Sequence, residues 1–504
     1  MSLAESARSL LRRHVFLAGL AGLAAFVVYR TAWVSDDAII TFRYVWNFRH
    51  GYGAVFNVGE RVQGYTHPLW FLLLAAMSVV TNDEVYAATA LSLGLTVAAV
   101  LVFGSRCITA ARDRTAALLV TALVVVVFVS SDSWRSFQTS GLEGALSTFL
   151  VVLFATDVLA EGPAQSPARI VLSGSLLALC RPDFSLIVTA PCAVALMIAA
   201  RTHRVRQTAA ALIPLLGFGV SRWYYGELLP NTGAAKLGIF TPQAALHQGS
   251  VYLLDWAKNE PITVFASCAL FVFGLVRLRG GLPRALGFGL IAYDVYVVAV
   301  GGDFMRGRFL VPVFVGSCAF GGIALARTLD VGWRVPTIAA TLAGLGAFAL
   351  AASAAAPAQT RTLDHEIANE RIFFLATQSL SAYRANGRLA HEDVFDLVRP
   401  YLDACGNVTV HSQHPGALGY YLGPRLTVID TLGLTDRFIA HLPRANLRYN
   451  PPRPGHPYRR LPYAYLARRG DVSIVSGWEA AMRKLDCSLP ERVKPFEDDP
   501  SLAP

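Results

Sequence analysis

Repeated long apolar runs constrain this chain more than any other feature of its sequence. Clear runs lie at residues 14–34, 86–104, 115–130, 142–160, 184–200, 262–278, 284–300, 309–326 and 335–355, and shorter ones at 168–180 and 207–220. A helix needs about 20 predominantly apolar residues to cross the hydrocarbon core of a bilayer. The sequence therefore predicts a multi-pass α-helical membrane protein with about eleven spans.

The composition supports this interpretation. Hydrophobic residues make up 54% of the 504 residues and charged residues only 15%, whereas soluble domains carry roughly 25% charged residues. An ordinary cytosolic enzyme, a disordered chain and a disulfide scaffold are therefore excluded. The net charge of +10 would also suit nucleic-acid binding, but arginines that mark one side of a membrane explain it, and we expect no nucleic-acid partner.

One short run decides the predicted topology. Pro68–Val80 has only about 13 residues, a length that suits an interfacial or re-entrant segment better than a span. If it does not cross and the N-terminus is cytoplasmic, every inner loop carries arginine, as the positive-inside rule requires. The sequence thus predicts a bacterial inner-membrane protein with its C-terminus in the periplasm. The first run could be a cleaved signal peptide, but we expect an anchor because ten spans follow.

The predicted membrane domain covers residues 1–355, with a first periplasmic loop at 35–85, and a soluble periplasmic α/β domain covers 356–504. Candidate helices in this tail are 362–385, 391–404, 459–468 and 477–485, and candidate strands are 408–411, 426–429 and 472–475. Cys405 and Cys487 could pair there in an oxidising compartment.

Paired carboxylates follow the first apolar run. Ionisable groups at a membrane boundary are costly, so each is a functional candidate. Asp36 and Asp37 could act as general base, metal ligand or both. They could equally cap the helix that the following residues predict. Two carboxylates are too few to name a metal, so no cofactor is assigned and a divalent cation stays open.

The other outer ends of the predicted spans carry further polar groups. Aromatic rings beside carboxylates in the first loop suit a sugar, although an interfacial aromatic belt would explain the rings alone. Arg181, Lys236 and Arg308 could hold an anionic phosphate, but Arg181 with Asp183 favours an ion pair. No nucleotide-binding or hydrolase motif occurs in a suitable context. The predicted topology puts all these groups on the same side of the membrane as Asp37.

Several motifs then resemble one family. The first loop (SDDAIITFRYVWNFRHGYGAVFNVGERVQGYTHPLW) resembles that of bacterial membrane glycosyltransferases of the GT-C fold, in particular the terminal arabinofuranosyltransferases of mycobacterial cell-wall assembly. Similar motifs are TSGLE, RPD, YYGELLPNT, GGDFMRGRFLVP, VIDTLGLTD and RPGHPY. The resemblance implies a polyprenyl-phosphate donor, such as decaprenyl-phosphate arabinofuranose, and a catalytic acid at Asp36 or Asp37, of which we favour Asp37.

The same resemblance suggests roles for the remaining residues. Donor and phosphate binding would involve Lys236, Arg308, Arg181, Asn231 and Tyr225. Sugar binding would involve Glu60, Tyr65, His67, Glu143, Asp303 and His456. The partners are then the lipid-linked sugar, membrane lipid and an acceptor glycan or glycoprotein bound by the tail. The alternatives are a transporter or flippase of lipid-linked sugar, an enzyme of the same fold that uses mannose or another hexose, and a non-catalytic scaffold.

Overall fold

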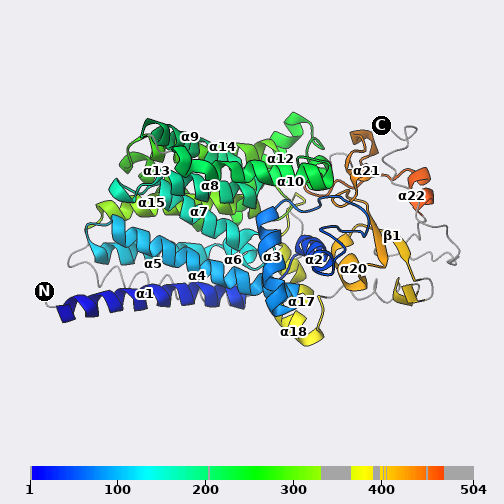
Figure 1. Cartoon of the computed structure of the whole chain (residues 1–504), viewed down its shortest axis with the longest axis horizontal. Helices are drawn as coiled ribbons and strands as arrows, with labels where there is room; N and C mark the ends of the chain where they lie inside the picture. Colours follow the sequence, from blue (N-terminus) through cyan, green and yellow to red (C-terminus); the bar gives the residue numbers. More distant parts are fainter. Residues whose placement is uncertain are drawn as a thin grey trace.

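The computed structural model describes residues 3–202, 205–330, 365–389, 398–400, 402–403, 406–449 and 452–469. A bundle of long helices forms one part of the molecule, and a small α/β unit packs against one end of it (Figure 1). The bundle contains α1 (Leu3–Arg30), α4 (Glu84–Ala110), α5 (Arg114–Ser130), α7 (Gly144–Val158), α8 (Pro167–Cys180), α9 (Ser185–Arg201), α10 (Ile213–Tyr225), α13 (Pro261–Arg277), α14 (Gly281–Ala299) and α15 (Val311–Thr328).

Further helices connect these elements. They are the short α6 (Asp132–Gln138) and α11 (Asn231–Lys236), the longer α12 (Pro242–Asn259), and the 3-10 helices η1 (Gly162–Ala164), η2 (Pro182–Phe184), η3 (Val205–Leu212) and η4 (Arg308–Leu310); a further 3-10 helix, η6 (Arg444–Asn446), lies in the tail. The α12 and α13 axes are bent by 105° at their junction, and α5 and α6 by 83°. Both bends lie where the chain leaves the bundle, next to the loops that carry the polar motifs.

Several described helices are long and apolar enough to cross a membrane. There are five such helices among the described residues, or up to seven if each bent pair counts as one span. The apolar helices α7, α8 and α3 (Pro68–Thr81) are shorter. This confirms a helical protein with several candidate spans. The run at 207–220 falls on η3 and the start of α10, and the run at 335–355 lies outside the described residues, so the eleven-span count stays a prediction.

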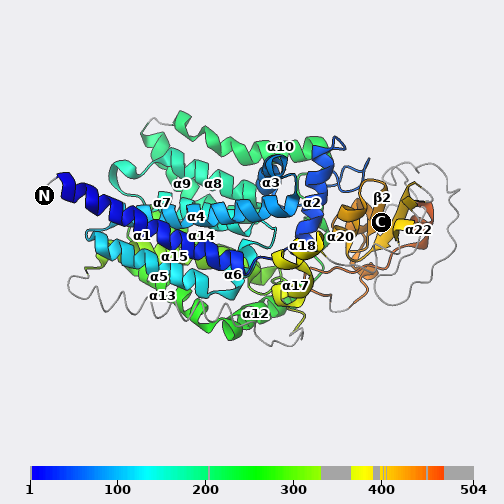
Figure 2. The same cartoon turned by 90° about the horizontal axis from the view of Figure 1, so that it is seen from below.

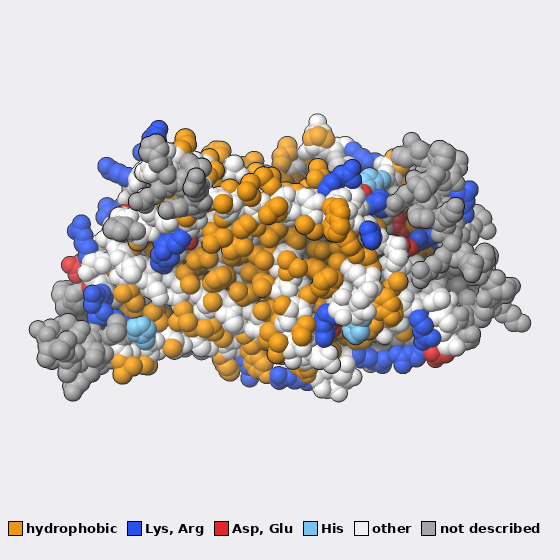
Figure 3. Space-filling model, viewed as in Figure 1, with side chains coloured by type: hydrophobic (Ala, Val, Ile, Leu, Met, Phe, Trp, Pro, Cys, Tyr) orange, Lys and Arg blue, Asp and Glu red, His pale blue; other side chains and the backbone are white. Residues whose placement is uncertain are grey.

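The surface of the bundle suits a lipid environment. Figure 3 shows a broad hydrophobic surface over the middle of the molecule, with Lys and Arg side chains gathered toward its two ends. Large apolar side chains such as Leu216, Phe265, Val276 and Phe288 are mostly exposed. A contiguous apolar surface of this kind is rare on a soluble monomer and marks a contact with membrane or protein.

Helix α15 forms the centre of the bundle, and small residues let its neighbours approach. A Cβ atom at Gly316 would lie 2.6 Å from the side chain of Leu290 in α14, and one at Gly322 would lie 2.6 Å from Phe103 in α4. Small residues at helix contacts are typical of membrane bundles, where packing rather than water drives association. The tight core fixes the helix ends that carry the candidate site.

Two helices lie across one end of the bundle. In Figure 1, α3 stands upright beside the roughly horizontal α1 and α4. That the Pro68–Val80 run does not cross the membrane stays a prediction. The other helix, α2 (Asp36–Arg49), buries Arg43, whose guanidinium donates to the carbonyl oxygens of Phe56 and Leu426, both at 2.6 Å. Arg43 therefore ties α2 to the first loop and to the tail.

The tail contains a small parallel sheet. Strand β1 (Val408–Ser412) pairs with β2 (Leu426–Asp430), with Val408 opposite Leu426, and α20 (Pro415–Leu422) connects them and packs on α2. The predicted strands at 408–411 and 426–429 are thus confirmed. The remaining described helices are α17 (Glu370–Gln378), α18 (Leu380–Asn386), α21 (Arg437–Ala440) and α22 (Tyr463–Arg469).

The other predicted tail elements differ or cannot be compared. The helix expected at 362–385 is broken, because Ser379 caps α18 by accepting a hydrogen bond from the Ala382 amide. The helix expected at 459–468 begins only at Tyr463. The elements expected at 472–475 and 477–485, most of the helix at 391–404, and Cys405 and Cys487 lie outside the described residues.

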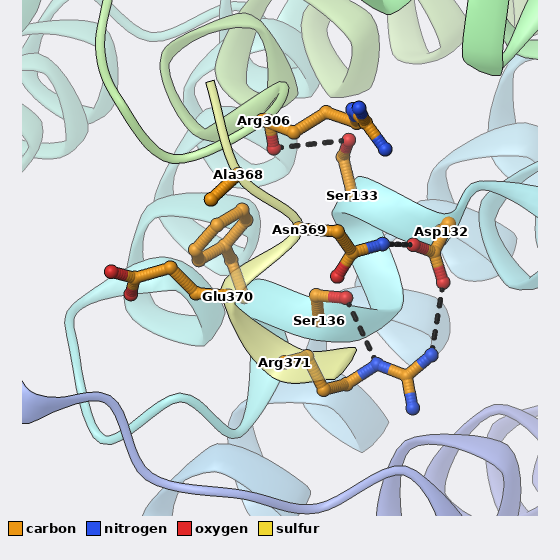
Figure 4. A pocket seen from close by; sticks show the side chains of 9 residues that line it. Asp132, Ser133, Ser136, Arg306, Ala368, Asn369, Glu370 and Arg371 are labelled. Atoms are coloured by element: carbon orange, nitrogen blue, oxygen red, sulfur yellow. Dashed lines mark hydrogen bonds and ion pairs between the residues drawn. The ribbon is translucent and has the colours of Figure 1, made fainter. Parts of the chain in front are cut away.

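A short segment of the tail docks directly on the bundle. This docking segment, residues 365–371, pairs with the loop after α14: the Ala368 amide donates to Phe304 (2.7 Å), and Ala368 accepts from the Arg306 amide (2.9 Å). Asn369 and Arg371 donate to Asp132 of α6 at 2.6 and 3.1 Å (Figure 4). The tail and the bundle therefore share one interface at this end, and both contribute side chains to it.

Candidate functional site

Asp37 sits in the first turn of α2, but it does not cap the helix. Ser35 is the N-cap, and its side chain accepts from the Ala38 amide at 3.3 Å. Asp36 and Asp37 follow it, where negative charge also suits the positive end of the helix dipole. Because Ser35 supplies the cap, the carboxylate of Asp37 is available to the interface, and its side chain is 25% exposed.

The loop between α14 and α15 presents the second carboxylate. Gly301 and Gly302 have φ of +90° and +69°, and a Cβ at Gly302 would lie 2.5 Å from the ring of Tyr252. Only glycine makes this turn without strain. The Tyr252 hydroxyl then donates to the Met305 carbonyl (2.9 Å) and accepts from the Phe309 amide (3.2 Å), which holds the loop. The loop thereby fixes Asp303 and Arg308 at the end of the bundle.

Asp37, Asp303 and Arg308 form the central cluster. The Arg308 guanidinium lies 3.7 Å from Oδ2 of Asp37 and 3.5 Å from Oδ2 of Asp303. Burial raises the pKa of Asp303, against the opposing effect of Arg308 and Lys236. Lys236, the last residue of α11, lies 5.8 Å from the ring centroid of Phe304. Carboxylates and cations from three separate segments thus meet at one place.

A second cluster lies next to the first. The Arg181 guanidinium donates a hydrogen bond to Glu143 at 2.8 Å and one to each carboxylate oxygen of Asp183 at 2.9 and 2.8 Å. Nδ1 of His67 lies 2.9 Å from Glu143, and its Nε2 lies 3.0 Å from the Thr41 hydroxyl. Although burial opposes ionisation, His67 and Arg181 hold the pKa of Glu143 well below its ordinary value. The predicted Arg181–Asp183 ion pair is therefore present.

The tail adds groups to the central cluster. The ring of His456 packs edge-on against Phe304, with centroids 4.1 Å apart, and burial together with Lys236 lowers its pKa to about 4. Nδ1 of His414 lies 3.9 Å from Asp36. Burial, with the charges of Asp37 and Asp303, raises the pKa of Glu370 well above its ordinary value. Glu370 and His414 were not among the residues chosen from the sequence.

Other predicted site residues have partners elsewhere. Glu60 pairs with Arg469 at 2.6 Å. The hydroxyls of Tyr65 and Tyr225 bond each other at 2.9 Å, and Tyr225 also donates to the Ala54 carbonyl. The amide of Asn231 donates to carbonyls of the tail at Gly433, Leu434 and Asp436. In the structure these side chains join the first loop, α11 and the tail to one another.

An apolar groove opens beside the second cluster. It runs between α8, α10 and the first loop. Its lining includes Tyr65, Pro182, Val220, Tyr225 and Leu228, and Val220 and Leu228 are largely exposed on the outer surface. Pro182 directly follows Arg181 in the chain, so the inner end of the groove lies beside the charged residues.

Within the described ranges, no group of three His, Cys, Asp or Glu side chains is arranged to hold a metal ion. The polar groups that meet here are instead arranged as carboxylate–cation pairs, which can bind hydroxyls and an anion.

Comparisons with known proteins bear on the resemblance seen in the sequence. No protein-family model matches the chain. A terminal β-(1→2)-arabinofuranosyltransferase of Corynebacterium glutamicum is 31% identical over 63% of this chain and 52% of its own length. The protein of the same name from Mycobacterium tuberculosis is 26% identical over 82% of this chain and 80% of its own. The chain's curated homologues are terminal β-(1→2)-arabinofuranosyltransferases. The predicted family resemblance is thereby confirmed.

The matches to these homologues cover only part of each protein. The chain matches about half the length of the Corynebacterium protein and about four fifths of the Mycobacterium protein. Among solved structures, the chain is similar to ArnT from Cupriavidus metallidurans bound to undecaprenyl phosphate, with 16% identity over 85% of this chain and 76% of that chain and a TM-score of 0.40.

Proposed function

We propose that the chain is a membrane glycosyltransferase that transfers arabinofuranose from a polyprenyl-phosphate donor to a hydroxyl of a periplasmic acceptor glycan. The observation that carries this proposal is the central cluster, where Asp37 and Asp303 each lie within 4 Å of Arg308. The second cluster lies next to it, and the apolar groove opens beside that second cluster. The curated homologues, which are named for transfer of this sugar, support the choice of arabinofuranose.

Asp37 is the general base in this proposal. It deprotonates the acceptor hydroxyl as that oxygen attacks the anomeric carbon of the donor sugar. The bond from the anomeric carbon to the phosphate oxygen breaks, and its electron pair leaves with the polyprenyl phosphate. Asp37 keeps the acceptor proton until solvent removes it. The side chain of Asp37 is 25% exposed, which gives an incoming hydroxyl access to the carboxylate. A single displacement of this kind inverts the anomeric carbon, and a product with a retained anomer would require a different mechanism.

Arg308 and Lys236 bind the donor phosphate and stabilise the charge that develops on it as it leaves. Both lie close enough to Asp303 to influence its ionisation, so the phosphate would sit between them. Arg181 is less suitable, because its guanidinium is already bound by Glu143 and Asp183. We assign Arg181 to holding the second cluster in place, with His67 and Glu143 oriented for contacts with the sugar.

The isoprenoid tail of the donor occupies the apolar groove. The groove is open toward the exposed side chains of Val220 and Leu228, which would face lipid, so the donor enters laterally without leaving the bilayer. At its other end Tyr65 lies 6.3 Å from His67, centroid to centroid. A lipid chain in the groove would therefore bring its headgroup to the two clusters.

The site faces the periplasm of the bacterial inner membrane, and the tail binds the acceptor there. Arginines gather at the opposite end of the bundle: Arg106 and Arg169 both pair with Asp157, and Arg327 pairs with Glu161. The positive-inside rule assigns such an end to the cytoplasm. Figure 2 shows α1 running from this end to the one where α2 and the tail lie. Reporter fusions after residues 161 and 60 test this orientation, and equal signals would exclude it.

The decisive experiment uses purified protein in nanodiscs with a panel of polyprenyl-phosphate sugars. We expect release of polyprenyl phosphate and transfer of labelled arabinofuranose to an acceptor glycan. Asp37→Asn should lower the rate about 10²- to 10⁴-fold. The matched control is Glu161→Gln, which removes a 72% exposed carboxylate at the other end of the bundle. If Asp37→Asn and Asp36→Asn both transfer at the wild-type rate, the assignment of the base is wrong.

The same assay separates the alternatives. A flippase would move the lipid-linked sugar across the bilayer and release no polyprenyl phosphate. A transferase specific for mannose or another hexose would release the carrier only from that donor. A scaffold would tolerate Asp37→Asn and Lys236→Met in cells without a phenotype.

A further inference from the structure

A tail residue with no role in the mechanism above lies beside the loop that carries Asp303 and Arg308, because Ala368, two residues before it, is hydrogen-bonded to Phe304 and Arg306 of that loop. We propose that Glu370 is a substrate-binding residue of this site, which donates the hydrogen bond of its carboxylic acid to the sugar that lies against Asp303. The inference rests on the proposed function and adds to it, because it makes the tail part of the donor site itself.

The docking segment fixes where Glu370 points. Its neighbours Asn369 and Arg371 hold Asp132 of α6, and Arg371 also donates to Ser136 at 3.2 Å. In Figure 4 the Glu370 side chain extends away from these interactions, to the other side of the backbone. The Glu370 carboxyl group therefore takes no part in these docking hydrogen bonds.

Glu370 and Asp303 each present an unsatisfied oxygen. Oε2 of Glu370 and Oδ2 of Asp303 are buried without a hydrogen-bond partner among the described residues, although Arg308 lies 3.5 Å from the latter. A buried polar atom without a partner costs about 1–3 kcal/mol, so each such atom calls for an explanation, of which a bound water, ion or substrate is one. Two of them around one cluster indicate a polar ligand that supplies both partners, such as a sugar with neighbouring hydroxyls.

The charges around Glu370 favour its neutral form. Asp36 and Asp37 of α2 and Asp303 of the loop all oppose its ionisation, and Arg308 alone of the influential groups favours it. On the side of the docking contacts, the cavity next to Glu370 is lined by Asp132, Arg306 and Arg371, and these are paired with one another or with Asp255. A neutral carboxylic acid donates one hydrogen bond, while ionised Asp303 accepts. The pair can thus hold two adjacent sugar oxygens.

The test measures binding of polyprenyl-phosphate arabinofuranose and of bare polyprenyl phosphate to the full chain in nanodiscs. We expect wild type to prefer the sugar-bearing lipid, and Glu370→Ala to lower that preference about 3- to 10-fold, the size of one lost hydrogen bond. Glu370→Gln, whose amide still donates, should keep most of it. The matched control is Glu366→Gln, which alters a 41% exposed side chain of the same segment. Unchanged binding of the bare lipid shows that each variant is folded.

Raising the pH should weaken the wild-type preference as Glu370 loses its proton, and Glu370→Gln should lack this part of the pH dependence. The proposal is overturned if wild type shows no preference, if Glu370→Ala keeps it, or if Glu370→Gln loses as much as Glu370→Ala. A wild type that prefers the sugar lipid through Glu370 but transfers no sugar would instead reject the proposed function and leave this inference standing.

Discussion

Replacing Arg181 by methionine tests whether the second cluster is structural. The Arg181 guanidinium is 8% exposed and binds Glu143 at 2.8 Å and both oxygens of Asp183 at 2.8–2.9 Å. The substitution leaves two buried carboxylates without their cation. Breaking a buried ion pair in this way costs about 3–5 kcal/mol. We therefore expect a large loss of stability and, with it, a loss of activity that follows the folded fraction.

The assay is unfolding in detergent, monitored by temperature and by denaturant. Arg425→Met is the matched control, because Arg425 and Asp403 pair at 3.8 Å with side chains that are 55% and 67% exposed, and exposed pairs contribute roughly 0–1 kcal/mol. Removing the orphaned charges with Glu143→Gln and Asp183→Asn in the Arg181→Met background should restore part of the stability. If Arg181→Met unfolds like wild type but no longer binds polyprenyl phosphate, the structural interpretation is refuted and Arg181 binds the phosphate.

Two further substitutions test the loop and the tail. Gly302→Ala should destabilise the protein by at least about 1–2 kcal/mol, because φ is +69° and the new Cβ would press on Tyr252; an unchanged melting temperature would contradict this. The pKa of His456 is lowered from 6.5 to about 4, so the unfolded state binds the extra proton between these values, and stability should rise with pH across that window. In His456→Gln this part of the rise should disappear, as denaturant titrations from pH 4 to 7 would show.

The membrane helices could be predicted because the bilayer imposes a length and a composition on each of them. The runs at 86–104 and 115–130 fall within helices of the structure, and those at 262–278 and 284–300 extend beyond their helices by a single residue. Helix breaks were harder to predict, because they depend on local capping. The break at Ser379 depends on one side-chain hydrogen bond to Ala382, and the run of helix-compatible residues around it gives no warning.

Residues of the candidate site that lie in sequence motifs were predicted, whereas a residue that only tertiary contacts bring to the site was missed. Asp37, Asp303 and Arg308 lie in distinctive loops at the ends of apolar runs, and they do meet. Glu370 lies in an ordinary amphipathic stretch, and only the pairing of Ala368 with Phe304 and Arg306 brings it to the cluster. The close packing of the tail on α2 is visible only in the structure: a Cβ atom at Gly416 would lie 2.7 Å from the Asp36 carbonyl oxygen.

Charge balance bears on how the proposed anionic donor would bind among so many carboxyl groups. Asp37, Asp303 and Glu370 all interact electrostatically with Arg308, and Asp36 does so with Glu370. If all four carboxyl groups were ionised, the net negative charge would repel the donor phosphate. Burial and the neighbouring carboxylates raise the pKa of Glu370 well above its ordinary value, so a proton held there leaves room for the phosphate and for the additional negative charge it gains on leaving. Donor binding should therefore weaken as Glu370 ionises, which links the tail carboxyl to the phosphate as well as to the sugar.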